Sequence, residues 1–342
     1  RWQWHMPNAI EHIKHLLLLS ILCSIVLFIN CGNSDNPVTD NDTNITNEDN
    51  TSDDSTDDST NEVSSNILTL NSNIDISKSW TQEPTGYTYS IDIHIPTEEM
   101  PSDGFPVCIL LHGNGGNGLD EIDHWSTVLT THVLVAPTGY MNSWNLCNED
   151  SNAADIEMVD TLANLLQEYT NINPNKIRIL GNSNGAGLAN SIFIENLNSG
   201  IDIVCAIVTH LTVPQYHLEN FYKIGNDTDP SNDYCGYEDL AATPLTSRKY
   251  LNISNDNDGI IPYLGGASPV GMDFLNAQDA IYVIAKSQGY DGNKLPDSGT
   301  PIGNPVVFEY SYLSGDVVHI RGEAYHGINP TQRDYVKTFL KE

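Results

Sequence analysis

Residues 176–185 read Lys-Ile-Arg-Ile-Leu-Gly-Asn-Ser-Asn-Gly, an apolar, β-branched run that ends in a Gly-x-Ser-x-Gly motif. An apolar helical stretch, Leu188 to Ile194, follows, so the serine has a strand-turn-helix context. A serine at the apex of so tight a turn adopts a strained backbone, and side chains in place of Gly181 or Gly185 would collide with the neighbouring strand and helix. The context predicts a nucleophile elbow with Ser183 as the nucleophile.

Around this motif, from residue 67 to residue 342, short β-branched runs alternate with amphipathic helical stretches. The predicted strands are Tyr87 to Ile95, Val107 to Leu111, Val133 to Ala136, Lys176 to Leu180, Asp202 to Val208, Lys249 to Ile253, Val306 to Leu313 and Val317 to Arg321. The other predicted helices are Asp155 to Tyr169, Asn276 to Gln288 and Pro330 to Lys341. Such alternation is typical of a mostly parallel sheet with helices on both faces. Together with the elbow it predicts an α/β-hydrolase fold in a single catalytic domain.

The N-terminus has the features of an export signal. Lys14 precedes an apolar run from Leu16 to Ile29, which is short for a membrane span but suits a secretory signal. The run ends at Phe28-Ile29-Asn30-Cys31-Gly32, which resembles a bacterial lipoprotein signal. We therefore expect a signal peptide over residues 1–31, with a lipid on Cys31 that attaches the protein to a membrane; a plain secreted enzyme is the alternative. Both place the protein outside the cytoplasm, secreted or at the cell surface.

Residues 32–66 form an acidic segment rich in Asn, Asp, Ser and Thr, with ten Asp and Glu and no Lys or Arg. Such a composition buries too little apolar surface to offset its conformational entropy, so a disordered linker is predicted. The whole chain has 14 basic and 45 acidic residues and a net charge of −31. That charge repels nucleic acid and anionic lipid head groups, and it excludes a nucleic-acid function.

Four cysteines lie in the predicted domain. Cys108 and Cys205 sit in apolar β-like runs and are expected to be buried small hydrophobes. Cys147 and Cys235 lie in polar loop sequence, where an exported protein can keep a disulfide, although the sequence leaves the pairing open. The stretch from Leu211 to Arg248 lacks clear periodicity, and we expect a long excursion between two strands. Long excursions in such folds often shape the substrate site.

Upstream of the elbow, an apolar strand opens into the Gly-rich loop His112-Gly113-Asn114-Gly115-Gly116. Acyl transfer needs two backbone N–H groups aimed at the developing oxyanion, and this loop is where the second donor is expected. We assign the donors to Asn184, directly after the nucleophile, and to Asn114. A phosphate-binding loop is excluded because the Lys and Ser/Thr that complete a P-loop are absent.

Two further strands run into loops that carry an acid and a base. The strand Lys249 to Ile253 leads into residues 254–263, which contain Asp256 and Asp258. A calcium loop is the competing interpretation, but the position of its terminal Glu is taken by Gly265, so no metal is expected. His326 follows the strand Val317 to Arg321 and completes the order Ser, Asp, His that α/β-hydrolases use. Core or surface roles are expected for four histidines that do not complete this order, His112, His124, His210 and His319.

These motifs together resemble the family of poly(3-hydroxybutyrate)-depolymerase-like and feruloyl-esterase-like secreted hydrolases, from about Tyr87 to the C-terminus. The matching segments are His112-Gly-Asn-Gly-Gly116, Ser143-Trp144-Asn145, Gly181-Asn-Ser-Asn-Gly-Ala186 and Asp258-Gly-Ile-Ile-Pro-Tyr263. The resemblance implies a triad of Ser183, Asp258 and His326, with Asp258 preferred over Asp256. It also makes Trp144 a candidate to line the acyl or aromatic site. The alternative is that Trp144 is buried beside a strand end and has a structural role. Glu323-Ala-Tyr325 and Ile328 depart from the family's pattern around the histidine.

The sequence thus predicts a serine esterase that cleaves a hydroxyalkanoate oligomer or polyester, a feruloyl-type ester or another short-chain ester through an acyl-enzyme, without a cofactor. A serine peptidase on the same fold is one rival, because the triad also serves amides. A surface-displayed binding protein with a relict hydrolase fold is the other. Retention of all three triad residue types and of the Gly-rich loop argues against that second rival.

Overall fold

The structure is a computed structural model, and it describes residues 66–225 and 234–341. The predicted signal segment, Cys31 and the acidic linker up to residue 65 lie outside the described residues. Within the two described ranges, no helix is both long and apolar enough to cross a membrane.

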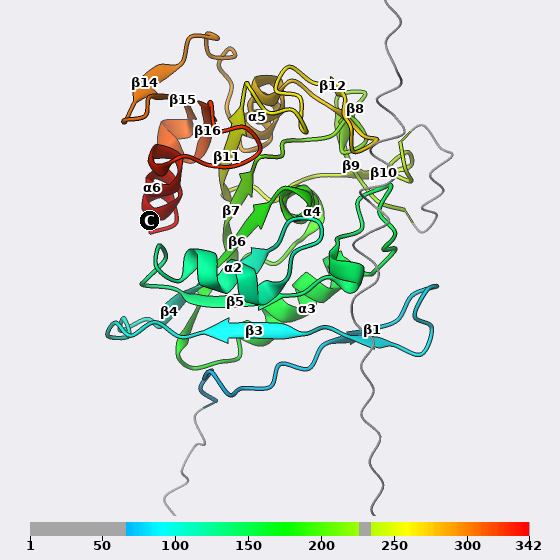
Figure 1. Ribbon diagram of the computed structural model, residues 1–342, viewed down its shortest axis with the longest axis vertical. Helices are drawn as coiled ribbons and strands as arrows, with labels where there is room; N and C mark the ends of the chain where they lie inside the picture. The colour runs from blue at the N-terminus through cyan, green and yellow to red at the C-terminus, as the bar shows by residue number, and fades with distance from the viewer. Residues whose placement is uncertain (1–65, 226–233, 342) are drawn as a thin grey trace, which may run out of the picture. The chain divides into compact units, whose positions relative to one another are not determined.

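A nine-stranded sheet forms the centre of the domain, with the order β14-β15-β16-β11-β7-β6-β4-β5-β3 (Figure 1). Its strands are β3 (Ile91–His94), β4 (Phe105–Leu111), β5 (Val133–Pro137), β6 (Ile172–Asn182), β7 (Ile201–Ile207), β11 (Lys249–Asn255), β14 (Thr300–Ile302), β15 (Val307–Tyr312) and β16 (Val317–Gly322). Six neighbouring strands of this sheet are parallel: β16, β11, β7, β6, β4 and β5. At one edge β3 pairs antiparallel with β5, and at the other β15 pairs antiparallel with β16 and with β14. The inner strands are buried on both faces, which explains their almost continuous apolar sequences.

The strand order has a switch point. The chain forms β4, places β5 on its outer side, then crosses back to β6 and proceeds through β7, β11 and β16 in the opposite direction. In open parallel sheets, functional sites lie at the carboxyl ends of the strands, beside such a reversal. Here β6, which adjoins it, ends in the serine-bearing turn. The chain has the α/β-hydrolase fold.

Helices cover both faces of the sheet, as predicted. They are α2 (Gly118–Trp125), α3 (Asp155–Leu166), α4 (Asn184–Glu195), α5 (Ala277–Ser287) and α6 (Pro330–Phe339). Successive side chains of a strand point to opposite faces. Accordingly Val107 and Ile109 of β4 pack in the cluster that contains α3, α4 and α5, whereas Cys108 and Leu110 pack in the cluster with α2 and α6.

Several elements differ from the predictions. The predicted strand over residues 87–95 is two strands, β2 (Tyr87–Thr88) and β3, which belong to different sheets; β2 pairs with β1 (Ser77–Lys78). The excursion after β7 forms a small antiparallel sheet of β8 (Tyr216–His217), β9 (Asn220–Lys223) and β10 (Leu240–Ala242). A short pair, β12 (Gly266–Ala267) and β13 (Asp273–Phe274), follows the acid loop. Helix α2 is also absent from the predictions, although Asn117 caps it by accepting a hydrogen bond from the backbone N–H of Asp120.

The cysteines divide into two kinds. Cys147 and Cys235 form a disulfide, with their Cα atoms 5.3 Å apart. It links the loop before α3 to the excursion, which answers the pairing that the sequence left open. Cys108 and Cys205 are free thiols without solvent exposure, which confirms their prediction as buried small hydrophobes.

Candidate active site

Ser183 lies between β6 and α4 with a left-handed backbone, φ 52° and ψ −116°. Such a conformation is unfavourable for a non-glycine residue and persists only where the surroundings enforce it. Two close approaches enforce it here. A Cβ on Gly181 would overlap the carbonyl group of Gly185, and a Cβ on Gly185 would overlap the carbonyl oxygens of Leu111 and His112. The steric role predicted for both glycines is confirmed.

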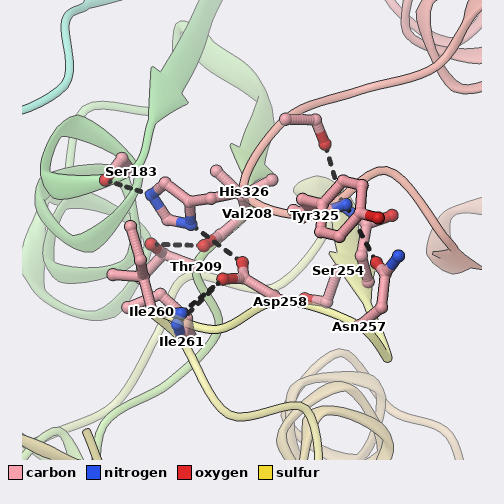
Figure 2. Close-up of polar contacts among 12 residues, drawn as sticks. Ser183, Val208, Thr209, Ser254, Asn257, Asp258, Ile260, Ile261, Tyr325 and His326 are labelled. Atoms are coloured by element: carbon pink, nitrogen blue, oxygen red, sulfur yellow. Dashed lines mark hydrogen bonds and ion pairs between the residues drawn. The ribbon is translucent and has the colours of Figure 1, made fainter. Parts of the chain in front are cut away.

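Ser183, His326 and Asp258 come together at the carboxyl ends of β6, β16 and β11. The hydroxyl oxygen of Ser183 lies 2.8 Å from Nε2 of His326, and Nδ1 of that ring lies 2.8 Å from Oδ2 of Asp258. Figure 2 shows the imidazole between the other two side chains. Asp256 does not join them, because its carboxylate faces Arg321 at 3.8 Å.

The surroundings of Asp258 fix both its charge and the orientation of the histidine. Its side chain is 2% exposed, and its Oδ1 accepts hydrogen bonds from the backbone N–H groups of Ile260 and Ile261. Burial acts to raise the pKa of Asp258, but the hydrogen bonds from His326 and from these two amides outweigh it and hold that pKa below its usual value. A carboxylate can only accept hydrogen bonds, so Nδ1 of His326 carries the proton and Nε2 is free to accept one from Ser183.

The histidine loop is held by a buried amide that sequence reasoning missed. The Asn255 side chain donates to the carbonyl oxygens of Tyr325 and Gly327, the residues on either side of His326, at 2.8 Å each. Gln332 of α6 in turn donates to Oδ1 of Asn255. The backbone N–H of Tyr325 donates to Asn257, and Tyr325 itself has φ 52°. Asn255 is simply the last residue of β11, and no sequence pattern sets it apart.

The two predicted oxyanion donors, Asn114 and Asn184, line the same cavity as Ser183. Asn184 is the first residue of α4, so its backbone N–H has no acceptor within the helix. In the Gly-rich loop, the N–H groups of Gly115 and Gly116 already donate to Asn142 and Gly113. Asn114, which directly precedes them and lines the cavity, stays the predicted second donor.

His112 is a structural support for that loop. Its Nε2 accepts a hydrogen bond from the backbone N–H of Gly139 at 3.0 Å, so the proton lies on Nδ1, which donates to the carbonyl oxygen of Gly113 at 2.7 Å. Burial lowers the pKa of His112 and keeps the ring neutral. His210 and His319 are buried in the core, where burial lowers their pKa values to about 4 and about 3. The core roles expected for these three residues are confirmed.

The site opens into a cavity of about 490 Å³, the first cavity. Its lining includes both apolar side chains and carboxylates. The apolar residues are Met141, Leu146, Ile261, Val270, Met272 and Phe274, and the acidic ones are Glu149 and Asp150. Such a mixture suits a small organic group with a polar end.

The expectation that Trp144 lines the substrate site is wrong. Its side chain has no solvent exposure and does not reach the first cavity. Its indole N–H donates to the carbonyl oxygen of His112 at 2.8 Å, and its ring packs against the His112 ring with centroids 4.7 Å apart. An indole is amphipathic, so burying it satisfies both its apolar body and its donor. Trp144 therefore supports the Gly-rich loop through its contacts with His112.

Asn184 has a second role that the sequence did not indicate. Its side-chain oxygen accepts a hydrogen bond from the backbone N–H of Trp144 at 2.7 Å, and its Nδ2 donates to the Trp144 carbonyl and to Glu149. The other carboxylate oxygen of Glu149 accepts from the backbone N–H groups of Leu146 and Cys147. Glu149 lies in the polar run Asn148-Glu149-Asp150, which gives no signal of this role.

No protein-family model matches the sequence, and no curated protein sequence matches it. Solved structures that resemble it include a carboxylesterase from Bacillus cereus, with 12% identity and a TM-score of 0.47 over 74% of this chain and 93% of the other. A phospholipase/carboxylesterase from Dyadobacter fermentans has 15% identity and a TM-score of 0.44 over 75% and 99%. A poly(3-hydroxybutyrate) depolymerase from Bordetella parapertussis has 16% identity and a TM-score of 0.41 over 58% and 72%. The fold assignment rests on the strand order and the elbow.

Proposed function

We propose that this chain is an extracytoplasmic serine carboxylic-ester hydrolase with Ser183, His326 and Asp258 as its catalytic triad. One observation carries the proposal: an unbroken line of hydrogen bonds, 2.8 Å each, from a buried carboxylate through an imidazole to a serine in a strained elbow. A nucleophile, a base and an orienting acid in hydrogen-bond reach are what nucleophilic acyl transfer needs.

In this mechanism His326 accepts the Ser183 proton at Nε2 as the serine oxygen attacks the ester carbonyl carbon. Asp258 stabilises the imidazolium without taking its proton. The backbone N–H groups of Asn114 and Asn184 stabilise the oxyanion, a contribution of about 3 kcal/mol for each donor in comparable sites. The alcohol leaves with the proton from His326, and a water molecule activated by the same imidazole then hydrolyses the acyl-enzyme.

The first cavity guides the choice of substrate. Its volume of about 490 Å³ and its apolar residues suit a short-chain or aromatic acyl group, and Glu149 and Asp150 disfavour an acyl group with its own carboxylate. A hydroxyalkanoate oligomer or polyester, a feruloyl-type ester and another short-chain ester all meet these conditions. They agree with membership of the depolymerase-like and feruloyl-esterase-like family that the motifs resemble.

Export is supported by the Cys147–Cys235 disulfide, because such bonds persist in oxidising compartments. We place the enzyme on the cell surface, anchored by a lipid on Cys31, or in secreted form. Metabolic labelling with a radioactive fatty acid tests the anchor: incorporation into the wild-type chain and none into Cys31→Ala is expected, whereas equal incorporation would contradict it.

The activity is tested with p-nitrophenyl esters of increasing acyl length, methyl ferulate and soluble hydroxybutyrate oligomers. We expect hydrolysis of at least one class and covalent labelling of Ser183 by a fluorophosphonate probe. Ser183→Ala should lose both. A chain that neither labels nor hydrolyses would instead be a non-catalytic protein, and preferential cleavage of peptide amides would favour a peptidase.

A further inference from the structure

A second cavity, of about 330 Å³, lies beside the same serine-bearing turn. Asn182 and His326 line it, together with residues of α2 and of the start of α6. The first cavity is lined by the next two residues of the turn, Ser183 and Asn184. Three consecutive residues of the elbow therefore divide between the two cavities. The hydrogen bond from Ser183 to His326, drawn in Figure 2, joins a residue that lines the first cavity to a residue that lines the second.

The chemistry of ester cleavage gives each cavity a different half of the substrate. When the tetrahedral intermediate collapses, the bond from the carbonyl carbon to the alcohol oxygen breaks. The proton on Nε2 of His326 moves to that oxygen and releases a neutral alcohol, while the acyl group stays bonded to Ser183. The leaving oxygen must be within hydrogen-bond reach of Nε2, so the alcohol lies on the His326 side. The oxyanion, and the acyl group beside it, lie on the side lined by Asn114 and Asn184.

We propose that the second cavity is the binding site for the alcohol half of the ester, and that this alcohol is an uncharged polyol. The proposal rests on the esterase function proposed above and extends it to the leaving group. The first cavity is then the acyl site.

The residues that line the second cavity indicate a hydroxyl-bearing alcohol. Asp120 offers carboxylate oxygens to hydroxyl donors, and Arg333 offers guanidinium N–H groups to hydroxyl acceptors. Trp125 and Ile328 supply apolar surface for the carbon skeleton. This lining contrasts with the apolar part of the first cavity.

The same residues disfavour a charged alcohol. A carboxylate on the leaving group would meet Asp120, and an ammonium group would meet Arg333. Because Asp120 and Arg333 carry opposite charges, a charged group on the alcohol is attracted by one of them and repelled by the other. An uncharged hydroxyl group avoids that repulsion. A polyol uses both donors and acceptors without this conflict.

The test separates the two halves of the ester with four substrates. Methyl butyrate is the reference, and methyl octanoate enlarges only the acyl half. Glycerol monobutyrate enlarges only the alcohol, and pentyl butyrate matches its number of non-hydrogen atoms without the hydroxyl groups. Wild type should show a higher kcat/KM for glycerol monobutyrate than for pentyl butyrate.

Two substitutions fill the cavities one at a time. Ile328→Trp narrows the second cavity and should lower kcat/KM for glycerol monobutyrate roughly tenfold relative to methyl butyrate, with methyl octanoate unchanged. Val270→Trp narrows the first cavity and serves as the matched control. It should lower kcat/KM for methyl octanoate and leave the ratio of kcat/KM for glycerol monobutyrate to that for methyl butyrate unchanged.

His124→Trp, at an exposed position on α2, narrows the second cavity from another side and repeats the measurement if Ile328→Trp does not fold. Arg333→Met should remove the preference for the glycerol over the pentyl ester.

The labelling rate of Ser183 with a small fluorophosphonate checks that each variant keeps an intact nucleophile. If Ile328→Trp or His124→Trp slows methyl octanoate in place of glycerol monobutyrate, or slows all four esters equally, the assignment of the cavities is overturned. A wild-type preference for pentyl butyrate would overturn the polyol. In each of these cases wild type still hydrolyses esters, whereas failure of the proposed function would appear as a wild type that hydrolyses none and does not label.

Discussion

The loops that carry the triad and the wall of the first cavity are held in place by different means. We define the cavity wall as residues 141–150 and 261–274. The triad loops follow directly from strands of the central sheet, which place them, and the side chain of Asn255, the last residue of β11, holds the histidine loop. The cavity wall depends on contacts between segments far apart in the chain: the disulfide of Cys147 with Cys235, and the Asn148 side chain, which donates to the carbonyl of Gly271, 123 residues away. The proposed triad is thus positioned by the central sheet, whereas the cavity wall, which contains no strand of that sheet, is positioned by cross-links between loops.

The largest expected effect is at the nucleophile. Ser183→Ala removes the attacking oxygen without disturbing the elbow, so kcat should fall by about 10⁴-fold or more, while the free energy of unfolding stays within about 1 kcal/mol of wild type. Steady-state hydrolysis and chemical denaturation measure the two quantities. Appreciable residual turnover would mean that another group is the nucleophile.

Asp258→Asn tests the orienting acid. An amide in place of the carboxylate no longer requires the proton on Nδ1 of His326, so we expect kcat to fall on the order of 10⁴-fold with KM little changed. The neighbouring Asp256→Asn is the control and should retain most activity, because Asp256 faces Arg321. The reverse result would identify Asp256 as the acid of the triad.

Removal of the disulfide addresses the cavity wall. The double variant Cys147→Ser, Cys235→Ser should be less stable by about 4.6 kcal/mol, since the bridge closes a loop of 88 residues. With the wall loosened, KM should rise several-fold and kcat should change little. Dithiothreitol should move wild type toward the variant and leave the variant itself unaffected. A drop in kcat with constant KM would show that the wall is not separable from the chemistry.

A smaller effect concerns Asp155, at the start of α3. Its carboxylate accepts hydrogen bonds from the backbone N–H of Asn145, in the cavity wall, and from the hydroxyl of Tyr89. Burial raises the pKa of Asp155 to about 7, and the two hydrogen bonds only partly oppose it. A raised pKa in the folded state means that the folded chain binds more protons than the unfolded chain between about pH 4 and 7. Stability should therefore fall as the pH rises through that window.

Between pH 5 and 8 this group should lower the free energy of unfolding by about 2 kcal/mol. Asp155→Asn removes the titration, so urea denaturation of the variant should vary less over the same interval. An unaltered pH dependence in the variant would mean that other groups cause it.

The sequence predicted the triad loops more accurately than the cavity wall. Ser183 was predicted as the nucleophile from two glycines and the strand before them, which are local steric signals. His326 was predicted as the base from its place after a strand and from the chain order. Trp144 was assigned to the substrate site incorrectly, since its partner His112 lies 32 residues away and nothing local indicates that the indole packs beneath the loop. Glu149 and Asn255 were missed for the same reason. The start of helix α2 could have been predicted, because Asn117 followed three residues later by Asp120 is a capping pattern.

Asn184 connects the two regions. Its backbone N–H is the predicted oxyanion donor, and its side chain binds Trp144 and Glu149 of the cavity wall. A variant library aimed at new acyl groups would therefore alter the acceleration of the reaction whenever it shifts Glu149. Val270 and Met272 also line the cavity, but they flank Gly271, which accepts a hydrogen bond from Asn148, the residue before Glu149. Substitutions on either side of the cavity wall can therefore reach the predicted oxyanion donor.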